Sequence, residues 1–253
     1  MPAATQQNTG AQAHFDRGRA LYERDDDSGE AMRQAETEFR NALRLHPRHA
    51  AAIAYLGLIA AANRKPVEAA ALYRKALEWD RNCAEAYVGL GRLRMEGGNR
   101  DLALAKYRRA VSADRNNVLA RRVLAEALTR TGTHPTATEL REAIECWQTL
   151  ICLNRNDREA PHELAQDYKK LSEWPEAEGE FREVLRIGQL PDDIVVWVHS
   201  VHSELAEVLE KQGKVDEALR EYQALIDSPG AADDEINSAK ARIGALQKSL
   251  RRR

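Results

Sequence analysis

Apolar residues recur along this chain at spacings of three and four residues, which is typical of helices that bury one face. The helical stretches come in pairs, and glycine stands where a turn must separate the two members of a pair, at Gly98, Gly132 and Gly213. The pattern therefore predicts a series of helical hairpins. The first helix of each hairpin is called helix A below and the second is called helix B.

The hydrophobic pattern itself repeats with a period of 34 residues. Six positions of one unit, Leu56, Gly57, Ala69, Tyr73, Ala76 and Asp80, recur 34 residues later as Leu90, Gly91, Ala103, Tyr107, Ala110 and Asp114. Such self-similarity over a few tens of residues predicts a stack of identical supersecondary units, in which each unit contacts its neighbours along the chain.

The conserved spacing within a unit has a simple packing explanation. A small residue on helix A allows the two backbones to approach, and the units have Gly57, Gly91, Ala125, Ala165 and Ala206 there. A second small residue on helix B receives the neighbouring helix, at Ala69, Ala103, Ala143, Ala177 and Ala218. Four residues later an aromatic side chain is expected to fill the groove between helices: Phe39, Tyr73, Tyr107, Trp147, Phe181 and Tyr222.

These residues resemble the tetratricopeptide repeat, whose signature combines a large residue, Leu-Gly and Ala-x3-aromatic with a closing proline. Residues 53–57 with 69–73 fit the signature, residues 87–91 with 103–107 fit it again, and Pro47 stands at the proline position. The resemblance implies an all-α fold, a right-handed α-solenoid of about six helix-turn-helix repeats followed by a C-terminal capping helix.

The repeat pattern divides the chain into three parts. We predict a disordered tail over 1–10, six repeats over 11–227, and a capping helix with a basic tail over 228–253. The approximate repeat bounds are 11–49, 50–83, 84–117, 118–157, 158–190 and 191–227. Insertions break the period at 25–29, at 131–135 and before Leu205. The last helix carries one apolar stripe that can cover the final repeat: Ile236, Ala239, Ile243, Leu246 and Leu250.

Composition narrows the range of functions. The chain has 253 residues, of which 43% are hydrophobic and 31% charged, so it has enough apolar residues for a buried core. Its 38 basic and 40 acidic residues leave a net charge of -2, which does not favour nucleic acid as a partner. We expect a cytoplasmic protein, because the N-terminus lacks the apolar region of a secretion signal, no stretch is apolar enough for membrane insertion, and the three cysteines suit a reducing compartment.

No arrangement of reactive side chains predicts catalysis. The pairs His46/His49 and His199/His202 have a spacing that could share a metal ion, but no nearby third ligand completes a site. Cys146 and Cys152 are best explained as buried structural thiols. We therefore expect a protein that is not an enzyme and that binds no metal and no cofactor.

The resemblance implies that the A helices line a concave groove in which a peptide or helix of another protein is bound. The groove residues expected from their offsets within helix A are Phe15, Arg19, Tyr22, Ala54, Tyr55, Leu58, Val88, Arg92, Met95, Arg122, Glu126, His162 and Gln166. The apolar members in the first three repeats predict an exposed patch for a partner. The alternative is that Tyr55 and Leu58 only pack between adjacent A helices.

Some members of the family hold a chaperone tail by its carboxylate, with Lys and Asn at fixed groove positions. Here the matching positions are Phe15, Arg19, Tyr55, Val88 and Gly89, so that particular clamp is absent.

A second candidate surface precedes the sixth repeat, where five apolar residues run consecutively over 194–198, among them Ile194, Val195, Trp197 and Val198. These residues are expected either to pack inside the array or to join two copies of the chain in a homo-oligomer. Our leading hypothesis is an adaptor or scaffold that binds a partner in the groove. The alternative is a structural subunit that assembles with itself or into a larger complex through the Trp197 segment and the outer helices.

Overall fold

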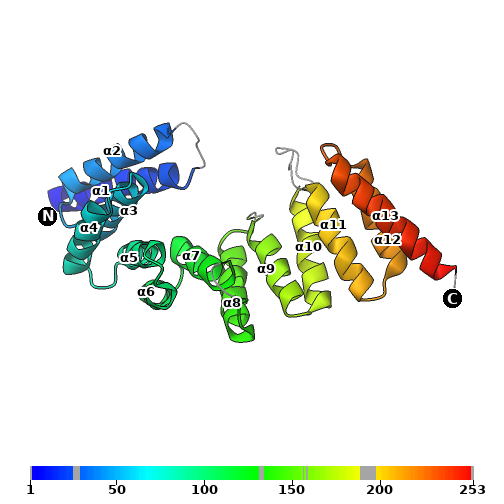
Figure 1. The fold of residues 1–253 in the computed structure, drawn as a ribbon. Helices are drawn as coiled ribbons and strands as arrows, with labels where there is room; N and C mark the ends of the chain where they lie inside the picture. Colours follow the sequence, from blue (N-terminus) through cyan, green and yellow to red (C-terminus); the bar gives the residue numbers. More distant parts are fainter. Residues whose placement is uncertain are drawn as a thin grey trace. The chain divides into compact units, whose positions relative to one another are not determined.

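The computed structural model describes residues 2–24, 29–130, 134–155, 157, 159–188 and 198–251, with the side chains of 2–8 and 198 left out. These residues form thirteen helices and no strand: α1 (Pro2–Tyr22), α2 (Glu30–Leu45), α3 (Ala50–Ala62), α4 (Pro66–Trp79), α5 (Ala84–Glu96), α6 (Arg100–Ala113), α7 (Val118–Thr129), α8 (Ala137–Leu153), α9 (Glu159–Lys170), α10 (Trp174–Gly188), α11 (Val198–Lys211), α12 (Val215–Asp227) and α13 (Asp233–Leu250). The all-α class and the helix-turn-helix repeats predicted from the sequence are confirmed (Figure 1).

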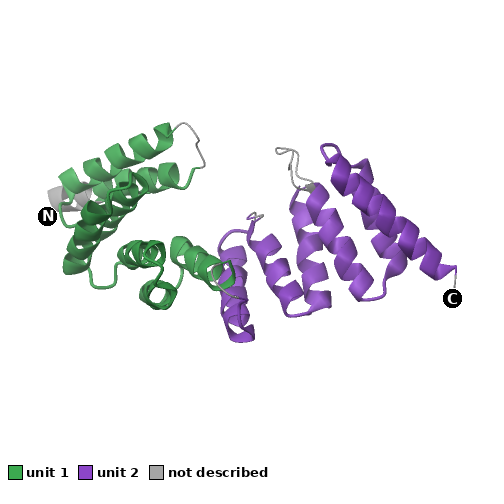
Figure 2. Ribbon diagram, viewed as in Figure 1, with its two compact units in different colours: residues 1–132 green, residues 133–253 purple. Residues whose placement is uncertain are grey.

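The chain divides into two compact units, residues 1–132 and 133–253 (Figure 2). In unit 1 the hairpins α1–α2, α3–α4 and α5–α6 follow one another, and α7 packs on α5 and α6. The A helices α3, α5 and α7 contact each other in order, so they form a continuous layer. In unit 2 each helix from α8 to α13 packs against the next along the chain.

The turns between helices A and B share one backbone conformation. Gly98 and Gly213 have φ of 75°, and Arg64 and Ser172 adopt the same left-handed conformation with φ of 58° and 61°. At each of these turns an amide donates back to a carbonyl of the preceding helix at 2.9 Å, as in Lys65 N to Ala60 O. This arrangement satisfies carbonyls that the end of helix A leaves without partners. Gly132, the third predicted turn glycine, lies outside the described residues.

The aromatic residue of helix B explains why glycine or alanine is needed on helix A. The ring of Tyr73 lies so close to Gly57 that a Cβ atom there would be 2.5 Å from Cε1. A Cβ atom at Gly89, on the next helix A, would be only 2.1 Å from Cζ of the same ring. Tyr107 fills the equivalent space beside Gly91. The predicted groove-filling role of the aromatic is confirmed, and Tyr73 packs against two A helices rather than one.

The C-terminal helix covers the hairpin before it. Ala239 of α13 joins a buried cluster with Ala206, Tyr222 and Leu225, against which Ile226, Ile236, Ile243 and Leu246 also pack. Leu250, the fifth residue of the predicted stripe, is 41% exposed instead. It stands at the last residue of α13, where the helix ends and covers nothing further.

The predicted N-terminal tail and the predicted insertions can be compared with the structure only in part. Helix α1 begins at Pro2, within the residues for which the sequence predicts a disordered tail. Its N-terminal part contains no proline after the first turn, so nothing in the sequence interrupts the helix there. Most of the first two insertions, 25–28 and 131–133, and the stretch 189–197 before α11 lie outside the described residues, and the repeat bounds stay a prediction.

Candidate functional site

The surface of unit 1 that is formed by α1, α3, α5 and α7 is called the A-helix face. Burial separates the predicted groove residues on these helices into two groups. Five of them are buried, with exposed fractions of 6% or less: Phe15, Ala54, Tyr55, Leu58 and Val88. The expectation that these residues form an exposed apolar patch is therefore corrected. The alternative weighed for Tyr55 and Leu58, packing between helices, describes this part of the face.

The buried group is held by aromatic contacts among the first three helices. The Tyr55 ring stacks on Phe39 with 4.9 Å between centroids and meets Phe15 edge-on at 5.6 Å. Phe15 in turn lies 4.7 Å from the ring of His49. Aromatic rings in these arrangements stabilise one another beyond the burial of their area. Phe15 and Tyr55 thus connect α1, α2 and α3 and are structural residues.

The accessible group on the A-helix face is mostly polar. It consists of Arg19, which is exposed, and five partly buried residues: Tyr22, Arg92, Met95, Arg122 and Glu126. Tyr22 leans on Tyr55 with 5.2 Å between ring centroids, which leaves its hydroxyl toward α5. There Nη1 of Arg92 donates a hydrogen bond of 3.4 Å to the Tyr22 hydroxyl. The face therefore presents an Arg–Tyr pair above an aromatic floor.

Two further tyrosines, Tyr73 and Tyr107 on helices B, are buried beneath this face. Burial raises the pKa of Tyr73 far above its usual range and raises the pKa of Tyr107 to about 12. Among the charges that act on both rings, Arg92 lowers these pKa values and Glu96 raises them. The Tyr73 hydroxyl is buried and has no hydrogen-bond partner. Sequence reasoning missed Tyr73, Tyr107 and Glu96, because it treated the helix B aromatics only as groove fillers.

Charged residues surround this cluster without giving it one sign. Burial raises the pKa of Glu23, whereas Arg19 on α1 and Arg122 on α7 lower it. Arg122 and Glu126 each have an interaction of their own within the chain. The accessible part of the A-helix face thus offers both cations and carboxylates around the partly buried Tyr22, which suits a ligand with polar and apolar parts.

The two predicted groove residues of unit 2 lie in a different setting. His162 and Gln166 on α9 both bind the carboxylate of Glu204 on α11, at 2.9 Å and 2.5 Å. A third contact between the same helices joins Lys169 and Glu207 at 3.1 Å. The predicted groove residues therefore form two separate groups, one within unit 1 and one within unit 2. Of the predicted oligomer surface, Ile194, Val195 and Trp197 and the side chain of Val198 lie outside the described residues.

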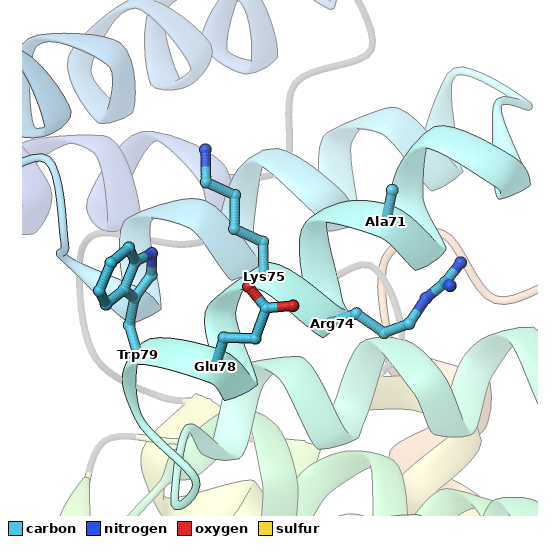
Figure 3. A pocket seen from close by; sticks show the side chains of 5 residues that line it. All are labelled: Ala71, Arg74, Lys75, Glu78 and Trp79. Atoms are coloured by element: carbon cyan, nitrogen blue, oxygen red, sulfur yellow. The ribbon is translucent and has the colours of Figure 1, made fainter.

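Unit 1 has a second surface feature on the opposite helix of its second hairpin. A shallow hollow of about 360 Å³ follows the exposed side of α4 and is lined by Ala71, Arg74, Lys75, Glu78 and Trp79 (Figure 3). The Trp79 ring is 45% exposed, and the guanidinium of Arg48 lies 4.4 Å from its centroid. Val67, at the other end of α4, is 82% exposed. Trp and Arg side chains are enriched among the residues that anchor protein interfaces, whereas Val is not.

The described residues contain no group of three His, Cys, Asp or Glu side chains arranged to hold a metal ion. Cys83 and Cys146 are buried and Cys152 is exposed, and burial holds the pKa of the Cys83 thiol above its usual range. In the part of the chain that the structure covers, no helix has the length and apolar character needed to cross a membrane.

The two units carry opposite net charges. Residues 1–132 contain 22 Lys and Arg against 16 Asp and Glu, a net charge of +6. Residues 133–253 contain 16 against 24, a net charge of -8. The net charge of the whole chain, -2, is small because these two charges nearly cancel. A site on unit 1 therefore lies on the positively charged part of the chain.

Comparison with known proteins agrees with the fold and the repeat. The model of the tetratricopeptide repeat family matches residues 32–86 and 88–151. No curated protein matches the sequence significantly. Among solved structures, this chain is similar to YrrB, described as a TPR protein with an unusual peptide-binding site, with a TM-score of 0.61 and 19% identity over 80% of this chain and 97% of that one.

Two other solved structures show the same fold. Pseudomonas aeruginosa pilF has a TM-score of 0.58 and 20% identity over 94% of this chain and 99% of its own. MamA has a TM-score of 0.54 and 21% identity over 68% of this chain and 92% of its own. Identities this low establish the fold alone. The α-solenoid class predicted from the sequence is thereby confirmed.

Proposed function

Because residues 32–86 and 88–151 are tetratricopeptide repeats, we propose that this chain is a non-enzymatic cytoplasmic adaptor whose unit 1 binds a peptide or helix of another protein on its A-helix face. One observation carries the proposal. Tyr22, Arg92 and Met95 are accessible on the layer of A helices, while the fold is held by the buried residues beneath them. Accessible aromatic, Arg and Met side chains together are enriched where proteins bind partners.

Two lines of support come from outside the site. The similar fold of YrrB belongs to a protein described as having a peptide-binding site. The A-helix face also combines a rigid support with accessible side chains, because α3, α5 and α7 pack in sequence and Tyr55 anchors α1 to them. A rigid surface loses little conformational entropy when it binds a flexible peptide.

The test is a selection of random peptides displayed on phage against the full chain, followed by measurement of affinity for the selected peptides. We expect Tyr22→Ala and Met95→Ala to weaken binding by about tenfold each, which is the effect of removing an interface anchor worth about 1.4 kcal/mol. Trp79→Ala, on the outer side of α4, is the matched control and should leave the affinity unchanged. Peptides whose affinity is insensitive to both A-helix variants would remove the proposal.

The exposed α4 side favours a second candidate function, assembly through the outer helices. We propose it because Val67 and Trp79 are large apolar side chains that the described part of unit 1 leaves in solvent. Light scattering during size-exclusion chromatography tests it across a wide range of protein concentration. Self-association that Val67→Ser with Trp79→Ser abolishes supports assembly, and a chain that stays monomeric at every concentration contradicts it.

A further inference from the structure

We infer that the outer edge of unit 1 binds a single-stranded nucleic acid. The outer edge consists of residues 40–48, 74–82 and 106–115, which are the C-terminal ends of the B helices α2, α4 and α6 with the turns that follow them. It belongs to the B helices and not to the A-helix face, so the inference goes beyond the proposed function and does not depend on it.

The outer edge holds the positive charge of unit 1. Its three segments contain ten Lys and Arg against three Asp and Glu, a net charge of +7. The other residues of 1–132 contain 12 Lys and Arg against 13 Asp and Glu, so they are almost neutral. The small net charge of the whole chain does not favour nucleic acid, but a phosphate backbone is attracted by the charge of the surface that it meets. The outer edge is a surface with the required charge.

The ends of the helices do not by themselves account for these cations. A cation near the C-terminus of a helix is stabilised by the helix dipole, but this effect is confined to the last turn. Neither α4 nor α6 has a basic residue in its last turn. Their cations Arg74, Lys75, Arg108 and Arg109 stand just before that turn and are exposed to solvent. These four side chains are therefore available to a ligand.

Contacts between the three segments make the outer edge continuous. The guanidinium of Arg48, which follows α2, lies 4.4 Å from the centroid of the Trp79 ring at the end of α4. Arg109 of α6 donates a hydrogen bond of 3.4 Å to Asn82, in the turn after α4. Both partners are neutral groups, so these contacts leave the charge of the two arginines uncompensated. An anionic polymer can therefore follow the edge across three repeats.

The carboxylates of the outer edge do not neutralise it. Asp80 and Asp114 stand at equivalent positions after α4 and α6, and each accepts a backbone amide of its own turn, at 2.8 Å and 3.0 Å. Glu78 is the third carboxylate, and it lines the hollow on α4 together with Arg74 and Lys75 (Figure 3). One carboxylate beside two cations leaves the lining of the hollow with a positive charge.

Trp79 distinguishes a nucleic acid from other polyanions. Its ring is 45% exposed and borders the hollow of about 360 Å³ on α4. Unpaired bases stack on aromatic rings and on guanidinium planes, whereas the acidic side chains of a peptide have no ring that could stack. Lys75 precedes Trp79 by four residues and so lies on the same side of α4, where it can meet the phosphate of a stacked nucleotide. A single strand is favoured because the bases of a duplex are already stacked and paired.

Fluorescence anisotropy of a labelled single-stranded oligonucleotide of about 15 nucleotides tests the inference on the full chain. The protein is used at a concentration at which light scattering shows a monomer. We expect saturable binding that weakens with salt, with a slope of log association constant against log salt of about -3 to -4, which corresponds to about five phosphate contacts. No binding at about 50 mM salt, or an affinity that salt does not change, would overturn the inference.

Competitors separate a nucleic acid from other occupants of the same surface. They are poly-glutamate of the same charge, a duplex of the same sequence and vesicles that contain phosphatidylserine. We expect each to compete more weakly than the unlabelled single strand by about tenfold. Equal competition by poly-glutamate would assign the edge to an acidic polypeptide, and stronger competition by vesicles would assign it to a membrane surface. Self-association through α4 that the oligonucleotide does not reverse would assign it to a second copy, and each of these results overturns the inference.

Substitutions distinguish stacking from charge. Trp79→Ala should weaken binding by about tenfold and remove the quenching of tryptophan fluorescence that stacking causes, whereas Trp79→Phe should keep most of the affinity. Lys75→Gln should make the salt slope shallower by about 0.7. Val67→Ser on the same helix and Arg94→Gln, an exposed cation of α5, are the matched controls and should leave the affinity nearly unchanged. A Trp79→Ala protein that binds and is quenched like the wild type contradicts the inference.

The variants of the A-helix face separate this inference from the proposed function. Tyr22→Ala and Met95→Ala should weaken peptide binding and leave oligonucleotide binding unchanged. If they weaken oligonucleotide binding as much as Trp79→Ala does, the outer edge is not the site. If no peptide is bound by the A-helix face while the oligonucleotide still depends on Trp79, the proposed function fails and the inference stands.

Discussion

At the scale of single residues, one tyrosine ring sets how closely two neighbouring A helices approach helix α4. Tyr73 requires two glycines, Gly57 and Gly89, because a Cβ atom at either position would overlap its ring. The same ring carries the buried hydroxyl that the fold does not satisfy. Close packing therefore fixes the position of the ring between the helices.

Glycine substitutions in two helices separate this packing role from helix propensity. Gly89→Ala should lower the free energy of unfolding by about 2 kcal/mol, because the new methyl group overfills the space beside Tyr73. Gly179→Ala, in α10, should raise it by about 0.5–1 kcal/mol, since nothing lies within 4 Å of its Cβ position and alanine favours helix. Denaturant unfolding measures both. Equal effects of the two changes would show that Tyr73 does not constrain Gly89.

Asp167 is the buried charge of unit 2 and provides a pH test. It accepts a hydrogen bond of 3.1 Å from Nε1 of Trp147 and lies 2.9 Å from the ammonium of Lys170. Burial raises its pKa above the ordinary value of 3.8, against the opposing effects of Lys170 and Trp147. Because the folded state then holds the proton more tightly than the unfolded state, this residue contributes stability that declines as the pH rises above 3.8 toward the folded pKa.

The prediction is measured as the difference in unfolding free energy between the wild-type protein and Asp167→Asn, which keeps an acceptor for Trp147. That difference should fall as the pH rises through the window that starts at 3.8. Asp216→Asn, an exposed site in the same unit, controls for the change in net charge. A difference that grows with pH would mean that the ion pair with Lys170 outweighs burial.

At the scale of helices, side chains close in sequence determine where a helix begins and ends. The neighbouring helices determine which of its faces is buried. Thr136 and Glu139 form a capping box at the start of α8, with each backbone amide donating to the other side chain at 2.9 Å and 3.2 Å. At the other end of the chain, α13 closes unit 2 by covering the α12 side chains Tyr222 and Leu225. Arg242 of α13 adds a bidentate pair with Glu210 on α11.

Removal of α13 tests its role as a cap. Deleting 231–253 should lower the unfolding free energy of unit 2 by on the order of 3 kcal/mol, because Ile236, Ile243 and Leu246 no longer cover the apolar cluster. Exposure of Tyr222 and Leu225 should also promote aggregation. Thermal unfolding and light scattering measure the two effects. Deleting only 251–253 is the control, and a stability loss of the same size there would show that the basic tail, not the packed stripe, matters.

At the scale of the whole molecule, the distribution of charge matters more than its sum. A partner approaching unit 1 meets a net charge of +6, so acidic peptides are attracted to it over distances set by the ionic strength.

Peptides selected by the full chain should accordingly be rich in Asp and Glu. Their association rate should fall by about tenfold when salt is raised from about 50 mM to about 500 mM, because the attraction is screened. Stopped-flow fluorescence measures the rate. Potassium and sodium salts of the same strength should act alike, and a rate that does not depend on salt would argue against electrostatic attraction by unit 1.

The sequence by itself determined the elements and their pairing. A 34-residue spacing of small and aromatic residues specifies hairpins, turns and the apolar stripe of α13, since each depends on residues close together along the chain. It also placed Arg19, Tyr22, Arg92 and Met95 on one side of the A helices, together with Phe15 and Tyr55.

Only the tertiary structure decided which residues of the A-helix face are available to a partner. Offsets within one helix place Phe15, Tyr55 and Tyr22 on the same side, but Phe15 and Tyr55 are covered because rings from α1, α2 and α3 meet over them. Exposure is a property of the neighbours of a side chain, which come from distant parts of the sequence, so helical periodicity does not determine it. For the same reason, the complete burial of the Tyr73 ring depends on the packing of α4 against α3 and α5, which the residues of α4 alone do not determine.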